Sequence, residues 1–239
     1  MNAFLYGVLL QWKLDLRNKG ILLTYYVVPL IFFGFIGGIF ISINPASKET
    51  LIESMTVFGV TMGAILGSPT PLTEHYGSTL KKAYHIGGIP LYIPAINNMI
   101  SAFIHLYIMS ITIFFIAPIA FDATVPTNRI FYFLSLAFFI IVSLTIGTLL
   151  GLFFKSASKL TMISQIIFLP SLMLSGIMFP SNMLPETLQN IGKILPATWG
   201  FKLLLNSSFC FDIIFPLLII AIVSILISIW RLSQIKVDS

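Results

Sequence analysis

The sequence predicts an all-α membrane protein with six transmembrane helices. Of its 239 residues, 57% are hydrophobic and only 9% are charged, whereas about a quarter of the residues in a soluble domain are charged. Six stretches without Asp, Glu, Lys or Arg reach the roughly 17–25 residues that a helix needs to cross the hydrocarbon. They are Gly20–Ser47, Ser54–Thr73, Ile86–Phe121, Ile130–Phe154, Leu160–Pro185 and Ile213–Trp230.

Lysine and arginine residues are distributed unevenly between the two sides of these spans. If both termini are inside, the inner segments hold Lys13, Arg17, Lys19, Lys81, Lys82, Lys155, Lys159, Arg231 and Lys236. The outer segments hold only Lys48, Arg129, Lys193 and Lys202. Because basic residues collect on the cytoplasmic side, we expect both termini to be cytoplasmic. This bias also explains the net charge of +5 without nucleic-acid binding.

Residues 1–19 are predicted to form an amphipathic helix that lies in the plane of the inner membrane surface. Its apolar residues recur at helical spacing: Phe4, Leu5, Val8, Leu9, Trp12 and Leu16. Its polar residues fall mostly on other faces: Gln11, Lys13, Asp15, Arg17 and Lys19. The alternative is a plain cytoplasmic lead-in to the first span.

Small and polar residues inside the spans are interpreted mainly as packing features. Gly59, Gly63 and Gly67 lie along one face of the second span, where they allow another helix to approach closely. His105 in the third span is expected to be a packing histidine, because all eight acidic residues lie outside the confident spans. Pro118 is expected to end that third span.

Residues 72–94 form the most polar inner stretch, with Glu74, Lys81 and Lys82 beside the apolar residues Leu80 and Tyr84. They are predicted to be a docking segment for a cytoplasmic partner. An ordinary solvated loop is the alternative.

Residues 176–207 are predicted to fold back at the outer membrane surface. The fifth span breaks at Ser175-Gly176, and Pro180, Pro185 and Pro196 follow; proline removes a backbone donor and clashes with a continuing helix. A short helix is expected after Pro185, and a second one over Thr198–Asn206.

The sequence lacks the patterns of the common catalytic and metal sites. It has no GxxxxGKS/T phosphate loop, no HExxH pair and a single cysteine, Cys210. The absence of carboxylates within the spans also counts against a proton pump or an ion-coupled transporter. We therefore expect no catalytic, cofactor or metal residues in this chain, no enzymatic activity, and an energy source in another subunit.

Two stretches resemble a known family. Leu174–Pro180 (LSGIMFP), followed by Leu184-Pro185 and Leu195–Trp199 (LPATW), is similar to the LSG-x-x-x-P…LP…LP signature of ABC-2 type transporter permeases. Glu74–Leu80 (EHYGSTL) resembles that family's E…GTL stretch after the second span, with Ser78 between the glycine and the threonine.

This resemblance implies the membrane subunit of an ATP-binding-cassette exporter in a bacterial plasma membrane, with the whole chain as one permease domain. Two permease chains, identical or different, would pair, and each would engage a separate ATPase subunit that binds ATP and Mg. The implied coupling residues are Glu74, Gly77, Thr79 and Leu80, to which the local sequence adds Lys81, Lys82 and Tyr84. The implied outer gate with its re-entrant helices contains Leu174, Ser175, Gly176, Phe179, Pro180, Pro185 and Pro196.

The expected substrate is a drug, a peptide or another amphiphile, as in multidrug efflux. The residues expected to line its pathway are Tyr25, Tyr26, Phe32, Met62 and Leu174. Export of lipid-linked polysaccharide or of ions is the alternative within the family. The alternatives from other classes are a gradient-driven secondary transporter or channel, and a membrane scaffold or intramembrane enzyme.

Overall fold

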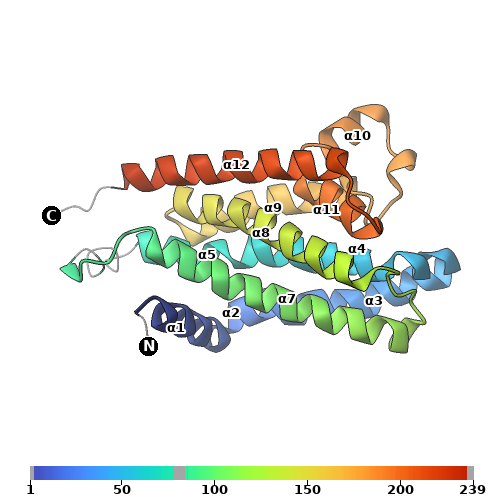
Figure 1. The fold of residues 1–239 in the computed structure, drawn as a ribbon, viewed down its shortest axis with the longest axis horizontal. Helices are drawn as coiled ribbons and strands as arrows, with labels where there is room; N and C mark the ends of the chain where they lie inside the picture. The colour runs from blue at the N-terminus through green and yellow to red at the C-terminus, as the bar shows by residue number, and fades with distance from the viewer. Residues whose placement is uncertain (1–2, 78–83, 85, 236–239) are drawn as a thin grey trace.

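The computed structural model describes residues 3–77, 84 and 86–235, and all secondary structure in these ranges is helical (Figure 1). In chain order the elements are α1 (Ala3–Arg17), α2 (Lys19–Leu22), η1 (Leu23–Val27), α3 (Val28–Ile43), η2 (Pro45–Glu49), α4 (Leu51–Met62), η3 (Gly63–Gly67), α5 (Pro69–Gly77), α7 (Ile93–Phe121), α8 (Arg129–Phe153), α9 (Ala157–Leu174), η4 (Ser181–Met183), α10 (Glu186–Gly192), α11 (Pro196–Leu205) and α12 (Phe211–Gln234).

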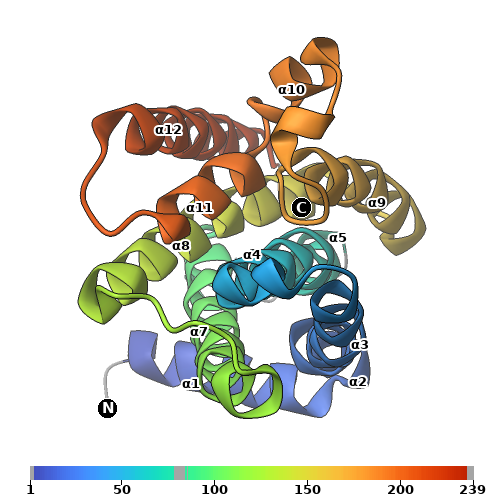
Figure 2. The same cartoon turned by 90° about the vertical axis from the view of Figure 1, so that its right-hand side faces the viewer.

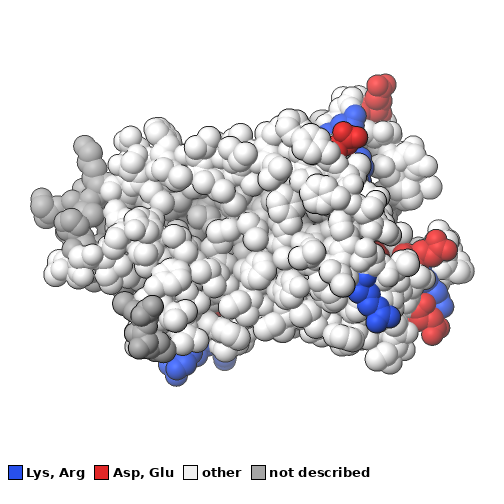
Figure 3. Space-filling view, viewed as in Figure 1, with Lys and Arg blue, Asp and Glu red and all other residues white. Residues whose placement is uncertain are grey.

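Within the described residues, six helical stretches are long and apolar enough to cross a membrane, which confirms the predicted number of spans. They are Lys19–Ile43, Leu51–Gly77, Ile93–Phe121, Arg129–Phe153, Ala157–Leu174 and Phe211–Gln234. Helix α1 and the last turns of α12 lie at one end of the bundle, and α10 lies at the other (Figure 1). The face shown in Figure 3 carries charged side chains only near these two ends, so the belt between them suits hydrocarbon.

The second span, α4–η3–α5, occupies the centre of the bundle, between α3, α7, α8 and α9 (Figure 2). In its apolar window 94% of the residues are buried, against 67% or less in each of the other spans. This span also carries buried hydroxyl groups, and one of them, Thr56 Oγ1, shares a hydrogen bond of 3.0 Å with Tyr132 OH of α8. In the centre of the bundle, neighbouring helices supply hydrogen-bond partners for these hydroxyl groups, whereas lipid cannot.

The glycine stripe on the second span packs inside the chain, as its spacing predicted. A Cβ atom at Gly59 would lie 2.5 Å from Met109 Cε, and one at Gly67 would lie 2.6 Å from Tyr25 Cε1. The stripe therefore faces the first and third spans, and the absent side chains are what let these helices approach.

Replacing Gly147 of α8 by alanine is expected to lower the free energy of unfolding by about 1–2 kcal/mol. A Cβ atom at Gly147 would overlap the main-chain oxygen of Ala64 and Ser68 Oγ, so α8 would have to move away from η3. The measurement is the Tm of the purified protein in detergent. Gly34→Ala is the matched control, because a Cβ atom there meets nothing within 4 Å. An equal Tm for the two variants would contradict the prediction.

Two helix ends differ from the sequence prediction. Helix α7 continues through Pro118 to Phe121, so the expectation that Pro118 ends the third span was wrong. A proline this close to the C-terminus removes one hydrogen bond from the last turns only, and the helix ends instead where Asp122 adopts a left-handed conformation with φ of 50°. The helix of the second span extends to Gly77, beyond the charge-free run that ended at Thr73.

At the opposite end of the bundle from α1, the break predicted at Ser175-Gly176 is confirmed. Helix α9 ends at Leu174, and Gly176 has a φ of 90°, a conformation that favours glycine. Helices α10 and α11 follow, as expected from the prolines. Thr198 Oγ1 donates to the main-chain oxygen of Gly192 at 2.6 Å, which ties α11 to the end of α10. Helix α11 packs against α4, α8, α9 and α12.

Candidate functional site

A buried polar cluster joins α1 to α7 near the end of the bundle where the chain starts. Asp15 of α1 is only 1% exposed. Its Oδ2 accepts a hydrogen bond of 2.6 Å from Ser101 Oγ of α7, and its Oδ1 accepts one of 2.8 Å from Gln11 Nε2. Burial raises the pKa of Asp15, and these two hydrogen bonds oppose the rise. Gln11 in turn lies 3.3 Å from His75 Nε2 of α5, so the cluster links three elements.

Asp15 lies outside the six spans, as expected, but it is buried and not solvated. The polar residues of α1 divide into two sets: Gln11 and Asp15 are buried, whereas Lys13 and Arg17 are exposed. Glu53 is likewise buried, in the first turn of α4 and so at the start of the Leu51–Gly77 span; the expectation that all eight acidic residues lie outside the spans was therefore wrong for Glu53. Asp15 lies in the last turn of α1 and Glu53 in the first turn of α4. At such positions a count of charge-free runs cannot distinguish a buried face from a solvated one.

His105 of α7 is enclosed by aromatic rings next to this cluster. Its Nδ1 lies 2.8 Å from Tyr26 OH, and the Tyr25 ring stacks on it with centroids 5.4 Å apart. The Trp12 ring approaches edge-on at 5.5 Å. The histidine is fully buried, so the packing interpretation holds, although Asp15 lies one helical turn away through Ser101.

Several buried polar atoms on α7 and on the elements packed against it lack hydrogen-bond partners within the described part of the chain. They are Trp12 Nε1, Tyr25 OH, Asn97 Oδ1, Asn98 Oδ1 and His105 Nε2. Such groups are costly to bury in an apolar medium unless water or a partner satisfies them. The cluster is therefore a polar interior, and its sequence signal was visible as Asn97, Ser101 and His105 at intervals of four on α7.

Of the predicted coupling residues, Glu74, Gly77 and Tyr84 are described, and they lie at or beyond the C-terminal end of the second span. Glu74 and Gly77 are exposed on the last turn of α5, and the half-buried Tyr84 ring lies 5.9 Å from the His75 ring. A Cβ atom at Gly77 would lie 3.1 Å from the main-chain oxygen of Lys155, in the turn between α8 and α9. Thr79, Leu80, Lys81 and Lys82 lie outside the described residues.

The predicted gate residues follow one another through the connection from α9 to α11 and do not form a single cluster. Leu174 ends α9, Ser175 is buried, and Gly176 carries the positive φ. Phe179 and Pro180 are exposed. The remaining two are Pro185, exposed at the start of α10, and Pro196, buried in the first turn of α11.

The predicted pathway residues fall in different places. Met62 lines a cavity of about 300 Å³ between the first, second and fifth spans. Tyr25 and Tyr26 surround His105, and the Phe32 ring stacks on Phe58 with centroids 4.3 Å apart. Leu174 lies at the far end of α9.

The cavity beside Met62 is bordered by polar side chains inside the spans. Thr24 comes from η1, Thr70 from α5, and Thr161 and Gln165 from α9. Thr161 and Gln165 are exposed and stand one turn apart on the same face of α9. Gln165 lies midway along this span. The sequence signal was a polar pair at i, i+4 in the fifth span, which hydropathy averaging conceals.

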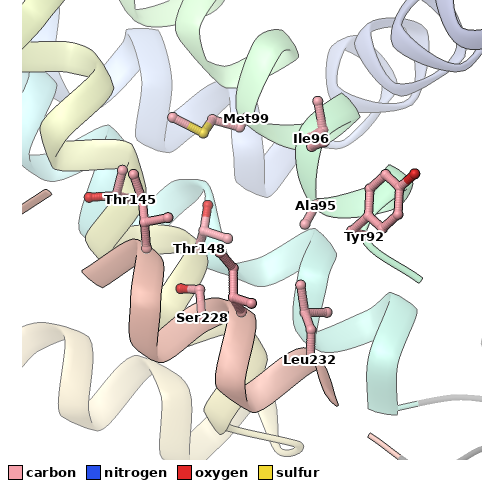
Figure 4. Close-up of a pocket in the computed structure, with 10 residues that line it drawn as sticks. Tyr92, Ala95, Ile96, Met99, Thr145, Thr148, Ser228 and Leu232 are labelled. Atoms are coloured by element: carbon pink, nitrogen blue, oxygen red, sulfur yellow. The ribbon is translucent and has the colours of Figure 1, made fainter. Parts of the chain in front are cut away.

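A second cavity, of about 430 Å³, lies between α7, α8 and α12 (Figure 4). Its lining is apolar apart from Tyr92 and three hydroxyl groups. Two of these hydroxyls already donate within their own helices, Thr145 to Val142 and Ser228 to Ser224. We assign no binding site to it, because the lining offers no charged group.

Comparison with known proteins agrees with the resemblance. The family described as ABC-2 type transporter matches residues 3–209 of this chain. The chain is also similar to a Bacillus subtilis (strain 168) protein named "Putative transport permease YvfS", with 25% identity over 202 residues that cover 82% of each chain. No solved structure matches it.

Proposed function

Because this multi-pass membrane protein belongs to the ABC-2 type transporter family, we propose that it is the permease subunit of an ATP-driven exporter of drugs, peptides or other amphiphiles. A separate ATPase subunit supplies ATP and Mg, and a second permease chain, identical or different, completes the pathway. The chain forms a single permease domain in a bacterial plasma membrane, with both termini in the cytoplasm. The excess of basic residues at that end supports this orientation.

One observation carries the proposal: exposed polar side chains in the middle of the fifth span. Gln165 would leave its amide without partners in lipid, at a cost of several kcal/mol. Gln165 and Thr161 line the same cavity as Met62 and Thr70. This face of the molecule therefore meets water or another protein. We assign it to the pathway between two permease chains.

The three specialised segments have separate roles in this proposal. Residues 1–19 lie in the inner membrane surface, because Leu5, Leu9 and Leu16 of α1 are exposed while Asp15 faces α7. Residues 72–94 dock the ATPase. Residues 176–207 form the outer gate with re-entrant helices.

A cysteine-accessibility experiment tests the pathway and its energy source together. In a Cys210→Ser background, Gln165→Cys is expected to react with a water-soluble thiol reagent at least tenfold faster than Ile222→Cys, because the reactive thiolate forms only in water. Ile222 is exposed near the middle of α12 and is the matched lipid-facing control. Adding ATP and Mg to membranes that contain the ATPase is expected to change the rate at Gln165→Cys only.

The outcomes separate the two parts of the proposal. Equal slow rates at both positions would remove this face from the pathway. A fast rate at Gln165→Cys that ATP does not change, in a preparation from which no ATPase copurifies, would favour a gradient-driven transporter.

A further inference from the structure

Glu53 is a buried carboxylate that no function described above uses. It lies in the first turn of α4 and is only 4% exposed. Its Oε2 has no hydrogen-bond partner among the described residues. An ionised carboxylate in that situation is unstable unless a counter-charge or several donors satisfy it.

The usual structural explanation for a glutamate at this position does not hold. Thr50 and Glu53 have the spacing of a capping box, in which the glutamate accepts from the N-cap amide. Here the Thr50 amide donates instead to the main-chain oxygen of Ser47 at 3.3 Å. Lys48, a nearby basic residue, pairs with Asp122 at 3.3 Å. Neither the cap nor this lysine neutralises Glu53.

Glu53 lines a cavity of about 140 Å³ where three connections meet. Glu49 comes from the end of η2, Thr124 and Thr127 come from the α7–α8 connection, and Asn206 comes from the α11–α12 connection. With Asn128 and Ser207 included, the lining contributes two carboxylates, three hydroxyl groups and two carboxamides. The Asn128 carboxamide is already engaged, since it donates to the main-chain oxygen of Ser207 and accepts from the Phe131 amide. The space is large enough for one ion and a few waters, each of which takes about 30 Å³.

We propose that this cavity is a Ca²⁺ site. Oxygen donors alone, of which two are carboxylates, suit a hard cation, and irregular loops match the flexible six- to eight-fold coordination of Ca²⁺ better than the strict octahedron of Mg²⁺. Transition metals are disfavoured, because they prefer imidazole or thiolate ligands and the cavity lining contains neither His nor Cys. The lining residues come from η2, the start of α4, the end of α11 and the α7–α8 and α11–α12 connections. A bound ion therefore ties these two connections to the start of α4.

The first test is direct binding of Ca²⁺ to the purified full chain, by equilibrium dialysis with ⁴⁵Ca and by the shift in Tm. We expect one ion per chain with a Kd on the order of 10⁻⁴–10⁻³ M, as in extracellular modules, and a Tm that rises with Ca²⁺ more than with equal Mg²⁺. Absence of a bound ion at about 10 mM Ca²⁺, tenfold or more above that range, would overturn the proposal.

Variants then locate the site. Glu53→Gln is expected to weaken Ca²⁺ binding at least tenfold and to abolish the Tm shift. Glu186→Gln is the control, because Glu186 is an exposed acid on α10 outside the cavity lining. If Glu53→Gln does not fold, Glu49→Gln replaces it, since Glu49 is exposed and its loss removes one donor without disturbing the core. Wild-type binding by the folded variant would contradict the assignment. None of these outcomes depends on transport activity.

Discussion

Replacing Asp15 by alanine is expected to lower the free energy of unfolding by about 2–4 kcal/mol and to loosen α1 from the bundle. The carboxylate accepts hydrogen bonds from Ser101 and from Gln11. Its removal leaves two buried donors without acceptors, and each such group costs about 1–3 kcal/mol. The measurements are the Tm in detergent and the hydrogen exchange of α1. A wild-type Tm for Asp15→Ala would show that the cluster does not hold this helix.

The matched variant Asp15→Asn separates the charge of this group from its hydrogen bonds. Burial raises the pKa of Asp15 above its unfolded value. Its stabilising contribution is therefore complete below the unfolded pKa, near 4, and is lost as the pH rises through the folded pKa. Relative to Asp15→Asn, the wild type should lose stability as the pH rises through this window. His75 and Tyr25 are present in both proteins, so the difference between the two pH profiles reports Asp15; parallel profiles would contradict the expectation.

The number of spans could be predicted from the sequence because a single physical rule decides it. In lipid, the backbone must satisfy its own hydrogen bonds, so each long apolar run becomes a helix. Local geometry also allowed two further predictions: the helix break at Ser175-Gly176, and the close packing of Gly59, Gly63 and Gly67. These features depend on residues that are close in the sequence.

The buried polar groups could not be predicted in this way, because tertiary contacts decide them. Asp15 is 86 residues from Ser101 in the chain, and charge alone placed it on the solvated side of α1. Glu53 lies one residue before a charge-free run, and only the meeting of three distant connections makes it buried. The polar residues that recur every four positions on α7 and α9 were visible in the sequence. Their spacing indicates that they share one face of a helix, but it does not indicate whether that face contacts protein, water or lipid.

The second large effect is expected at the last turn of α5. If the proposed docking segment is correct, Glu74→Lys should reduce ATP-dependent transport at least tenfold, because it reverses a charge that the ATPase contacts; a close charge pair at an interface is worth about 1.5–7 kcal/mol. Glu74 is exposed, so the substitution has no buried partner to disturb. The measurement is transport and ATP hydrolysis by the reconstituted complex, with Glu186→Lys on α10 as the control at the other end of the bundle.

The position of Glu74 explains why this effect should be on coupling and not on folding. Helix α5 continues through η3 into α4, and this central span is the most buried of the six. If the ATPase docks here, a push on the last turn of α5 would be transmitted along this packed helix, past Met62, to the far side of the bundle. ATP hydrolysis that persists while transport fails would be the signature of this uncoupling. Wild-type transport by Glu74→Lys would instead place the ATPase contact elsewhere on the inner face.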